Sequence, residues 1–133
     1  WGIGRVSEKV IDRINIYEAT HLAMERAVTN LAKRVSLDSL IIDGTMRITT
    51  TLPQKTVIRG DERIAVCAAA SIIAKVKRDR LMVKYHAKYP LYGFDRHKGY
   101  GTSYHLSQLK KQGLCEYHRQ SFSPCNRMVS VIE

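Results

Sequence analysis

The sequence has few cysteines, and their arrangement excludes two classes of protein. Cys67, Cys115 and Cys125 leave one thiol over after any disulfide and show no Cys-x-x-Cys spacing, which argues against a disulfide framework or a zinc ribbon. Cys115, His118 and Cys125 offer three ligands but lack a fourth at ordinary zinc spacing. The cysteines therefore favour a reducing, cytoplasmic setting.

Long hydrophobic runs are also missing. No apolar run approaches the roughly 20 residues that a membrane-spanning helix needs. The chain opens on Trp1 without the basic and then apolar segments of a secretory leader. We expect a soluble protein with no membrane contact. Because it begins with Trp rather than Met, we also expect a processed product or a piece of a longer protein.

Acidic residues are scarce relative to basic ones. The 133 residues, enough for one domain, contain 22 Lys and Arg against 12 Asp and Glu. Residues 1–66 hold 10 basic and 8 acidic residues, whereas residues 67–133 hold 12 and 4. Because neutralising phosphates releases bound counterions, this balance favours a polyanionic partner that contacts mainly the second half.

The first third of the sequence predicts one strand and two helices. The opening WGIGRV is typical of a short strand, and Ser7 is a plausible N-cap for a brief helix after it. Asn15 is a second cap, with Glu18 three residues later as in a capping box. The second helix is predicted to run to about Arg34.

Two short apolar runs that follow each lead to an aspartate. Residues 39–42 predict a strand buried on both faces that ends at Asp43, and residues 55–59 predict another strand that ends at Gly60 and Asp61. The two carboxylates are expected at one end of a sheet, where open α/β folds place their ligands. Carboxylates suit hard divalent cations, which catalyse phosphodiester cleavage in pairs.

A purely structural interpretation of both aspartates stays open at this point. Asp43-Gly44 is a common turn dipeptide. Asp61 stands just before a predicted helix, where it would serve as an N-cap and meet the helix dipole.

The helix predicted from Glu62 has one apolar face and many cations. Lys75, Lys77 and Arg78 lie outside that face and would either contact phosphates or form a solvated surface. The apolar face comprises Ala65, Ala69, Ile72, Ile73 and Val76.

After Pro90 comes a glycine-rich loop with aromatic and basic residues. Its segment HKGYGT is either an ordinary turn or a site where His97 and Lys98 hold phosphates while Tyr100 packs on a sugar or base. Thr102 or Ser103 is expected to cap a short helix, with residues 114–133 as a loop-rich tail.

Four segments in order resemble a known family: IIDGT at 41–45, RGDERIAVCAAASIIAKVKRDRLM at 59–82, YPLYGFDRHKGYGTSYHL at 89–106 and HRQSFSP at 118–124. Together they are similar to the type 2 ribonucleases H, specifically bacterial-style ribonuclease HII. The likeness extends to GRVSEKVIDRINIYEATHLAM at 4–24 and so covers nearly the whole chain.

The resemblance implies an α/β fold, in which helices flank a ribonuclease H-like sheet and a helical, loop-rich C-terminal region follows. Residues 1–90 would be the C-terminal part of the catalytic core, and residues 91–133 the substrate-binding loop, short helix and tail of the same domain. It also implies an endonuclease that cuts the RNA strand of RNA/DNA hybrids, or cuts at ribonucleotides in duplex DNA. We expect a monomer. The products would carry 3′-hydroxyl and 5′-phosphate ends.

Family resemblance also assigns site residues. Four acids in the family hold two Mg²⁺ or Mn²⁺ ions, and the third and fourth match Asp43 and Asp61. Tyr100 matches the tyrosine that packs on a sugar beside the scissile ribonucleotide. Apart from these family matches, the weaker candidates for phosphate contacts are Lys75, Lys77, Arg78, Lys98 and His97.

One family motif is missing from the sequence. The family's first two acids and its 2′-hydroxyl-reading loop lie in an Asp-Glu-Ala-Gly-Arg-Gly string, which does not occur in these 133 residues. The sheet is therefore expected to lack its first strands, and the chain by itself to be inactive. A non-catalytic, basic nucleic-acid-binding module and a purely structural partner domain remain alternatives.

Overall fold

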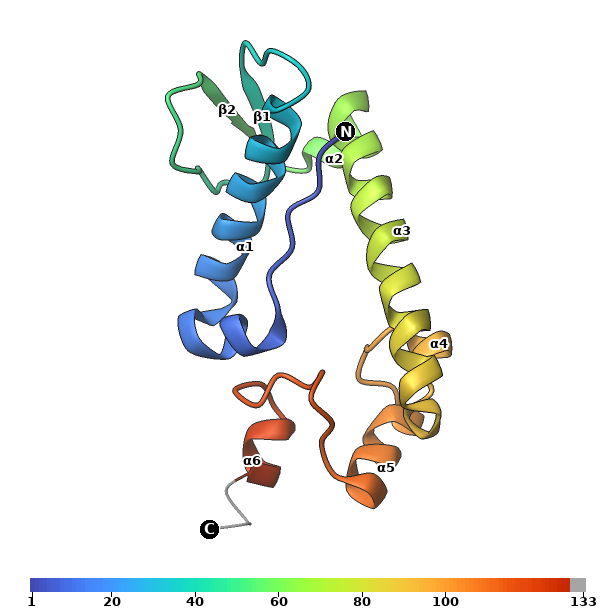
Figure 1. Cartoon of the computed structure of the whole chain (residues 1–133). Helices are drawn as coiled ribbons and strands as arrows, with labels where there is room; N and C mark the ends of the chain where they lie inside the picture. The colour runs from blue at the N-terminus through green and yellow to red at the C-terminus, as the bar shows by residue number, and fades with distance from the viewer. Residues whose placement is uncertain (130–133) are drawn as a thin grey trace. The chain divides into compact units, whose positions relative to one another are not determined.

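The computed structural model describes residues 1–129 (Figure 1). Its elements are α1 (Glu8–Ala32), β1 (Leu40–Asp43), β2 (Gln54–Val57), α2 (Gly60–Arg63), α3 (Ala65–Lys88), the 3-10 turn η1 (Pro90–Tyr92), α4 (Phe94–His97), α5 (Ser103–Gln112) and α6 (Cys125–Val129). The predicted mixed α/β class is confirmed. None of the helices in residues 1–129 is long and apolar enough to cross a membrane.

Two compact units make up the chain, with α3 running through their boundary. Unit 1 comprises residues 1–74, and unit 2 begins at residue 75. Each unit has its own buried side chains: Ala19, Ile42, Ile48 and Cys67 in unit 1, and Tyr92, Phe94, Leu109 and Cys125 in unit 2. The functional division predicted at residue 90 stays a prediction.

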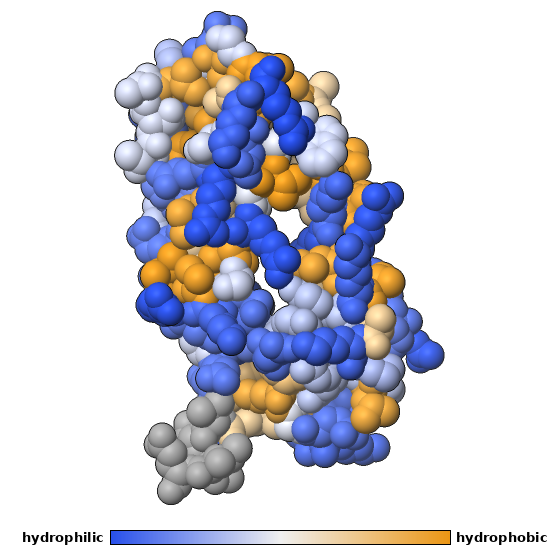
Figure 2. All heavy atoms as spheres, viewed as in Figure 1, coloured by the Kyte–Doolittle hydropathy of each residue, from blue (hydrophilic) through white to orange (hydrophobic). Residues whose placement is uncertain are grey.

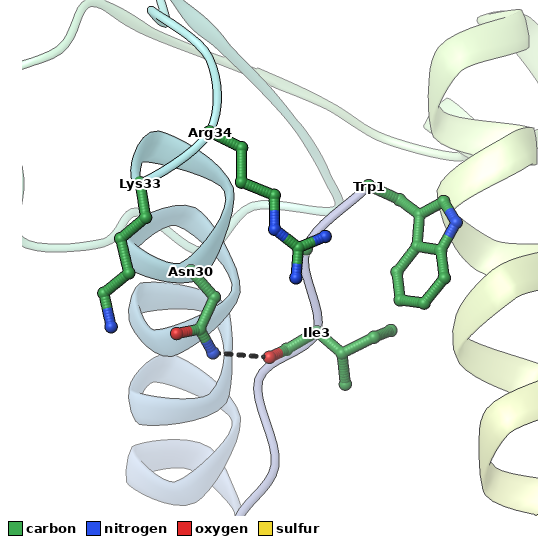
Figure 3. Close-up of a pocket in the computed structure, with 6 residues that line it drawn as sticks. Trp1, Ile3, Asn30, Lys33 and Arg34 are labelled. Carbon is green, nitrogen blue, oxygen red and sulfur yellow. Dashed lines mark hydrogen bonds between the residues drawn. The ribbon is translucent and has the colours of Figure 1, made fainter.

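The N-terminal segment is extended but forms no strand, so the strand predicted for WGIGRV is wrong. It lies along α1, where the amide of Asn30 donates to the carbonyl of Ile3 over 2.9 Å (Figure 3). A Cβ added to Gly4 would lie 1.7 Å from the Ala23 carbonyl oxygen. Glycine thus permits a close approach to one helix, and helix side chains take the place of a strand partner.

The two helices predicted before residue 35 are joined in α1 across a kink at Asn15. Asn15 has φ 68° and ψ 171°, and its side-chain oxygen accepts the N–H of Glu18 at 3.1 Å. The second cap is therefore confirmed. Ser7 stands at the first cap, but its backbone carbonyl, rather than its hydroxyl, accepts the N–H groups of Val10 and Ile11.

Strands β1 and β2 form a parallel pair in which Leu40 faces Gln54 and Asp43 faces Val57. Parallel strands need a crossover connection, which is usually helical, yet here residues 44–53 form an irregular loop. The Gln54 side chain holds this loop by accepting the N–H of Ile48 at 3.0 Å and donating to its carbonyl at 2.8 Å. The side-chain amide of Gln54 thereby makes hydrogen bonds to the loop backbone like those that a neighbouring strand would make.

The strand predicted at residues 39–42 is confirmed as β1, but its burial on both faces is wrong. Ile42 is 8% exposed, whereas Ile41 is 42% exposed. Side chains of successive strand residues point to opposite faces of a sheet, so only the face of β1 that carries Ile42 is covered, and Ile41 lies on the other face.

Helix α3 has the predicted helical periodicity, but its predicted apolar face is not buried. Ile72 and Val76 are exposed, and Cys67 is the one buried α3 residue in the described part of the chain. Apolar side chains therefore reach the surface beside hydrophilic ones, which Figure 2 colours orange and blue. The periodicity predicts an apolar face but does not show what covers it.

Unit 2 is built on an aromatic core where the sequence predicted only a loop. Tyr92 and Phe94 stack with ring centroids 5.4 Å apart, and the Tyr92 hydroxyl donates to the Gly113 carbonyl at 3.0 Å. Left-handed backbone at Gly93 and Lys98 divides the segment into the one-turn helices η1 and α4. The helix predicted after Thr102 is confirmed as α5, and it ends at Gly113.

Candidate active site

Asp43 occupies the C-terminal end of β1, as predicted, and its side chain is exposed. The N–H of Gly60 donates to its Oδ1 at 2.7 Å. A carboxylate has two oxygens with several lone pairs, so this bond leaves Oδ2 able to face a cation. The bond also ties the start of α2 to the end of β1.

Asp61 does not end a strand, and the predicted symmetry of two strand-ending acids is wrong. Strand β2 ends at Val57, and Asp61 lies four residues later in the first turn of α2. The reason is a sharp turn at Arg59, which has φ 56° and whose guanidinium bonds the Glu62 carboxylate at 3.0 Å. This turn brings the backbone beside Asp61 back to Asp43.

Gly60 allows the backbone before Asp61 to pass close to Asp43. A Cβ at this position would lie 3.3 Å from the Cα and 3.4 Å from the Oδ1 of Asp43, which is tighter than ordinary van der Waals contact. The glycine before Asp61 was not singled out from the sequence. Its position in the RGDE segment, between a turn and an acid, was the available signal.

The acids at this end of β1 suit a hard cation but do not form a complete shell. Asp43 and Asp61 offer exposed carboxylate oxygens, the ligands that Mg²⁺ prefers. Within residues 1–129 there is no cluster of three His, Cys, Asp or Glu residues able to hold a metal ion. A pocket in unit 1, lined by Trp1, Gly2, Ile3, Asn30, Lys33 and Arg34, contains neither acid (Figure 3).

The predicted phosphate-binding residues of α3 differ in their surroundings. Lys75 and Lys77 are exposed, and Lys75 pairs with Asp79 at 2.6 Å. Arg78 donates to the Lys98 carbonyl at 2.6 Å, and its guanidinium lies 5.4 Å from the centroid of the Tyr100 ring. Arg78 therefore supports the loop that carries Tyr100.

Within residues 97–100, the Tyr100 ring is exposed and the His97 ring is buried. Tyr100 is 59% exposed, which suits a ring that packs on a sugar or base. Lys98 is half-buried, and its ammonium group donates a hydrogen bond to the Asp95 carbonyl. His97 is buried, with its ring nitrogens bonded to the Tyr92 carbonyl and the Gly99 N–H. This geometry speaks against the phosphate contact predicted for His97.

Two further buried histidines, His105 and His118, were not predicted as functional. Their Nε2 atoms lie 3.2 Å apart, and Nδ1 of His105 faces the Tyr100 carbonyl at 2.9 Å. Burial lowers the pKa of His105 and, with the nearby His105 ring, lowers the pKa of His118 to about 4. They are 13 residues apart in the sequence, so no local spacing indicated the contact.

Comparison with known proteins decides the family. The family model described as ribonuclease HII matches residues 2–125. The chain belongs to the ribonuclease HII family. It is 51% identical over 129 residues to ribonuclease HII of Chlamydia caviae, covering 97% of this chain and 59% of that protein.

Other ribonuclease HII proteins are similarly close. That of Endomicrobium trichonymphae is 45% identical, covering 98% of this chain and 61% of the relative, and that of Bacillus mycoides is 48% identical, covering 96% and 49%. The chain therefore spans roughly half to three-fifths of the length of these ribonuclease HII relatives.

The buried histidine pair predicts how the stability of this ribonuclease HII chain depends on pH. The pKa of His118 is about 4 in the folded state against 6.5 for the unperturbed group. The unfolded state therefore binds more protons between these values, so stability is full above about pH 6.5 and falls as the pH drops toward about 4. Roughly 3 kcal/mol is expected to be lost across this window.

The measurement is the free energy of unfolding in urea as a function of pH. His118→Gln is expected to flatten the dependence, whereas His21→Gln, which removes a histidine from unit 1, serves as the control. An equally steep loss in the His118 variant would rule out His118 as its source.

Proposed function

We propose that this chain is the C-terminal part of an endoribonuclease that hydrolyses the RNA strand of RNA/DNA hybrids, or cuts at ribonucleotides embedded in duplex DNA. The products would carry 3′-hydroxyl and 5′-phosphate ends, and the enzyme would act as a monomer. Membership in the ribonuclease HII family supports the reaction class. The observation that carries the proposal within this chain is the bond from Gly60 N–H to Asp43, which ties the Asp61 turn to the end of β1.

Asp43 and Asp61 would hold the Mg²⁺ or Mn²⁺ ions of the site. Their exposed carboxylates fit the preference of these hard cations for oxygen ligands. When bound, a pair of such ions activates a water and stabilises the leaving oxygen. Two carboxylates cannot hold two ions in a full shell, so the remaining ligands must come from outside this chain.

The basic half of the chain would bind and orient the duplex. Tyr100 is proposed to pack on the sugar beside the scissile phosphate, because its ring is exposed and backed by the Arg78 cation. Lys75, Lys77 and Lys98 are proposed to contact phosphates. Such contacts position a duplex without reading its sequence, and their affinity falls with added salt.

The test uses the full-length protein and a DNA duplex that contains one ribonucleotide. With Mg²⁺ or Mn²⁺ we expect a single cut at that position, and a chelator or an all-DNA duplex of the same sequence should give none. Residues 1–133 alone are expected not to cut. Salt-dependent binding of the full-length protein without any cutting would contradict the proposal and favour a non-catalytic binding module.

A further inference from the structure

Three buried histidines of unit 2, at positions 97, 105 and 118, form one contiguous group. The rings of His97 and His105 stack with centroids 4.3 Å apart, and the Nε2 atoms of His105 and His118 lie 3.2 Å apart. None of the three histidines has a role in the proposed metal-assisted hydrolysis at Asp43 and Asp61. Buried ring nitrogens need hydrogen-bond partners, so these partners identify the groups that each ring positions.

The hydrogen bonds assign one proton position to each ring of the pair. Nδ1 of His118 accepts the N–H of Cys115 at 2.9 Å, so the neutral ring carries its proton on Nε2. Nδ1 of His105 faces the Tyr100 carbonyl and must donate to it, which leaves its Nε2 as an acceptor. His118 therefore donates from Nε2 to Nε2 of His105.

The backbone of Tyr100 is the end point of this chain of bonds. Its carbonyl accepts from His105 at 2.9 Å and from the N–H of Thr102 at 2.9 Å, while the Gly99 N–H just before it donates to His97 at 3.1 Å. The Tyr100 ring itself is exposed. Because burial does not hold the ring, its direction depends on these backbone bonds and on the Arg78 guanidinium.

We propose that His105 is a positioning residue: held in one tautomer by His118, it fixes the Tyr100 carbonyl and so directs the exposed ring toward the sugar of a bound ribonucleotide. This role rests on the proposed function, because it has an effect on cleavage only where Tyr100 contacts the substrate. The tautomers themselves do not depend on substrate.

The first experiment tests the bonds directly in the full-length protein. Long-range ¹H–¹⁵N spectra of the imidazole rings at neutral pH are expected to show the His105 proton on Nδ1 and the His118 proton on Nε2. A His105 ring protonated on Nε2, or one that averages between both tautomers, would overturn the proposal, whether or not the protein cuts nucleic acid.

The second experiment is a double-mutant cycle on cleavage of the single-ribonucleotide duplex. His105→Leu is expected to raise KM roughly 10-fold with little change in kcat, as loss of a stacking contact would. His105→Asn, whose amide places a donor near the position of Nδ1, is expected to restore much of the loss. In a Tyr100→Ala background, His105→Leu should add less than about 2-fold, because coupled residues are not additive.

The outcomes separate the two proposals. Additive effects of His105→Leu and Tyr100→Ala, or no rescue by His105→Asn, in a protein whose wild type cuts would overturn the positioning role alone. A wild type that does not cut would instead contradict the proposed function, and the ring spectra would still decide the tautomers.

Discussion

In the full-length protein, Asp61→Asn is expected to lower kcat by more than ~100-fold. Loss of a residue that only supports a metal ligand lowers activity by about 10- to 100-fold, whereas Asp61 is proposed to bind the metal itself. Asparagine preserves size but removes the negative charge that a hard cation needs. Affinity for the uncut duplex should change little, because phosphate contacts by Lys and Arg supply most of it. Cleavage rates and duplex binding measured on the same preparation give both quantities.

Asp38→Asn is the matched control for this prediction. Asp38 is an exposed acid of the same unit that precedes β1 instead of following it. The control should cut like wild type. If Asp61→Asn also retained wild-type kcat, Asp61 would be removed from the catalytic set.

Phe94→Ala is expected to cost the folded protein about 3–5 kcal/mol, the usual range for a buried phenylalanine. Phe94 is 2% exposed and is the largest fully buried side chain among the described residues. It stacks on Tyr92 and packs in one cluster with Leu109 and Cys125. The loss is a large part of the roughly 5–15 kcal/mol that a domain has in total.

Urea unfolding of the full-length protein measures this cost. Phe122→Ala is the control, because Phe122 is only half-buried and stacks on the Arg119 guanidinium at 3.8 Å. It should cost clearly less. Equal losses for the two variants would show that the aromatic cluster around Phe94 is not the core of unit 2.

Sequence patterns within single segments correctly predicted two helix caps and the first strand. Asn15 and Thr102 cap helices through the bonds that their side chains predict, and the apolar run before Asp43 is a strand. The burial of these elements was predicted less well. Ile41 and Ile72 are apolar yet exposed, because burial depends on neighbours that the pattern of one segment does not contain.

Contacts between distant residues explain the other differences. The opening segment WGIGRV predicted a strand, but Gly4 lies against Ala23 of α1. The left-handed turn at Arg59 moved Asp61 from a strand end into α2, and arginine gives little warning of positive φ. His105 and His118 meet although they are 13 residues apart in the sequence, a separation that no periodicity of a helix or strand predicts.

The position of a metal ion in crystals of the full-length protein tests the central proposal most directly. Crystals grown with Mn²⁺ allow the ion to be located by its anomalous scattering. We predict Mn²⁺ in contact with carboxylate oxygens of both Asp43 and Asp61, and its loss from this position in Asp43→Asn. Mn²⁺ bound elsewhere in the protein, with neither carboxylate among its ligands, would contradict the proposed site.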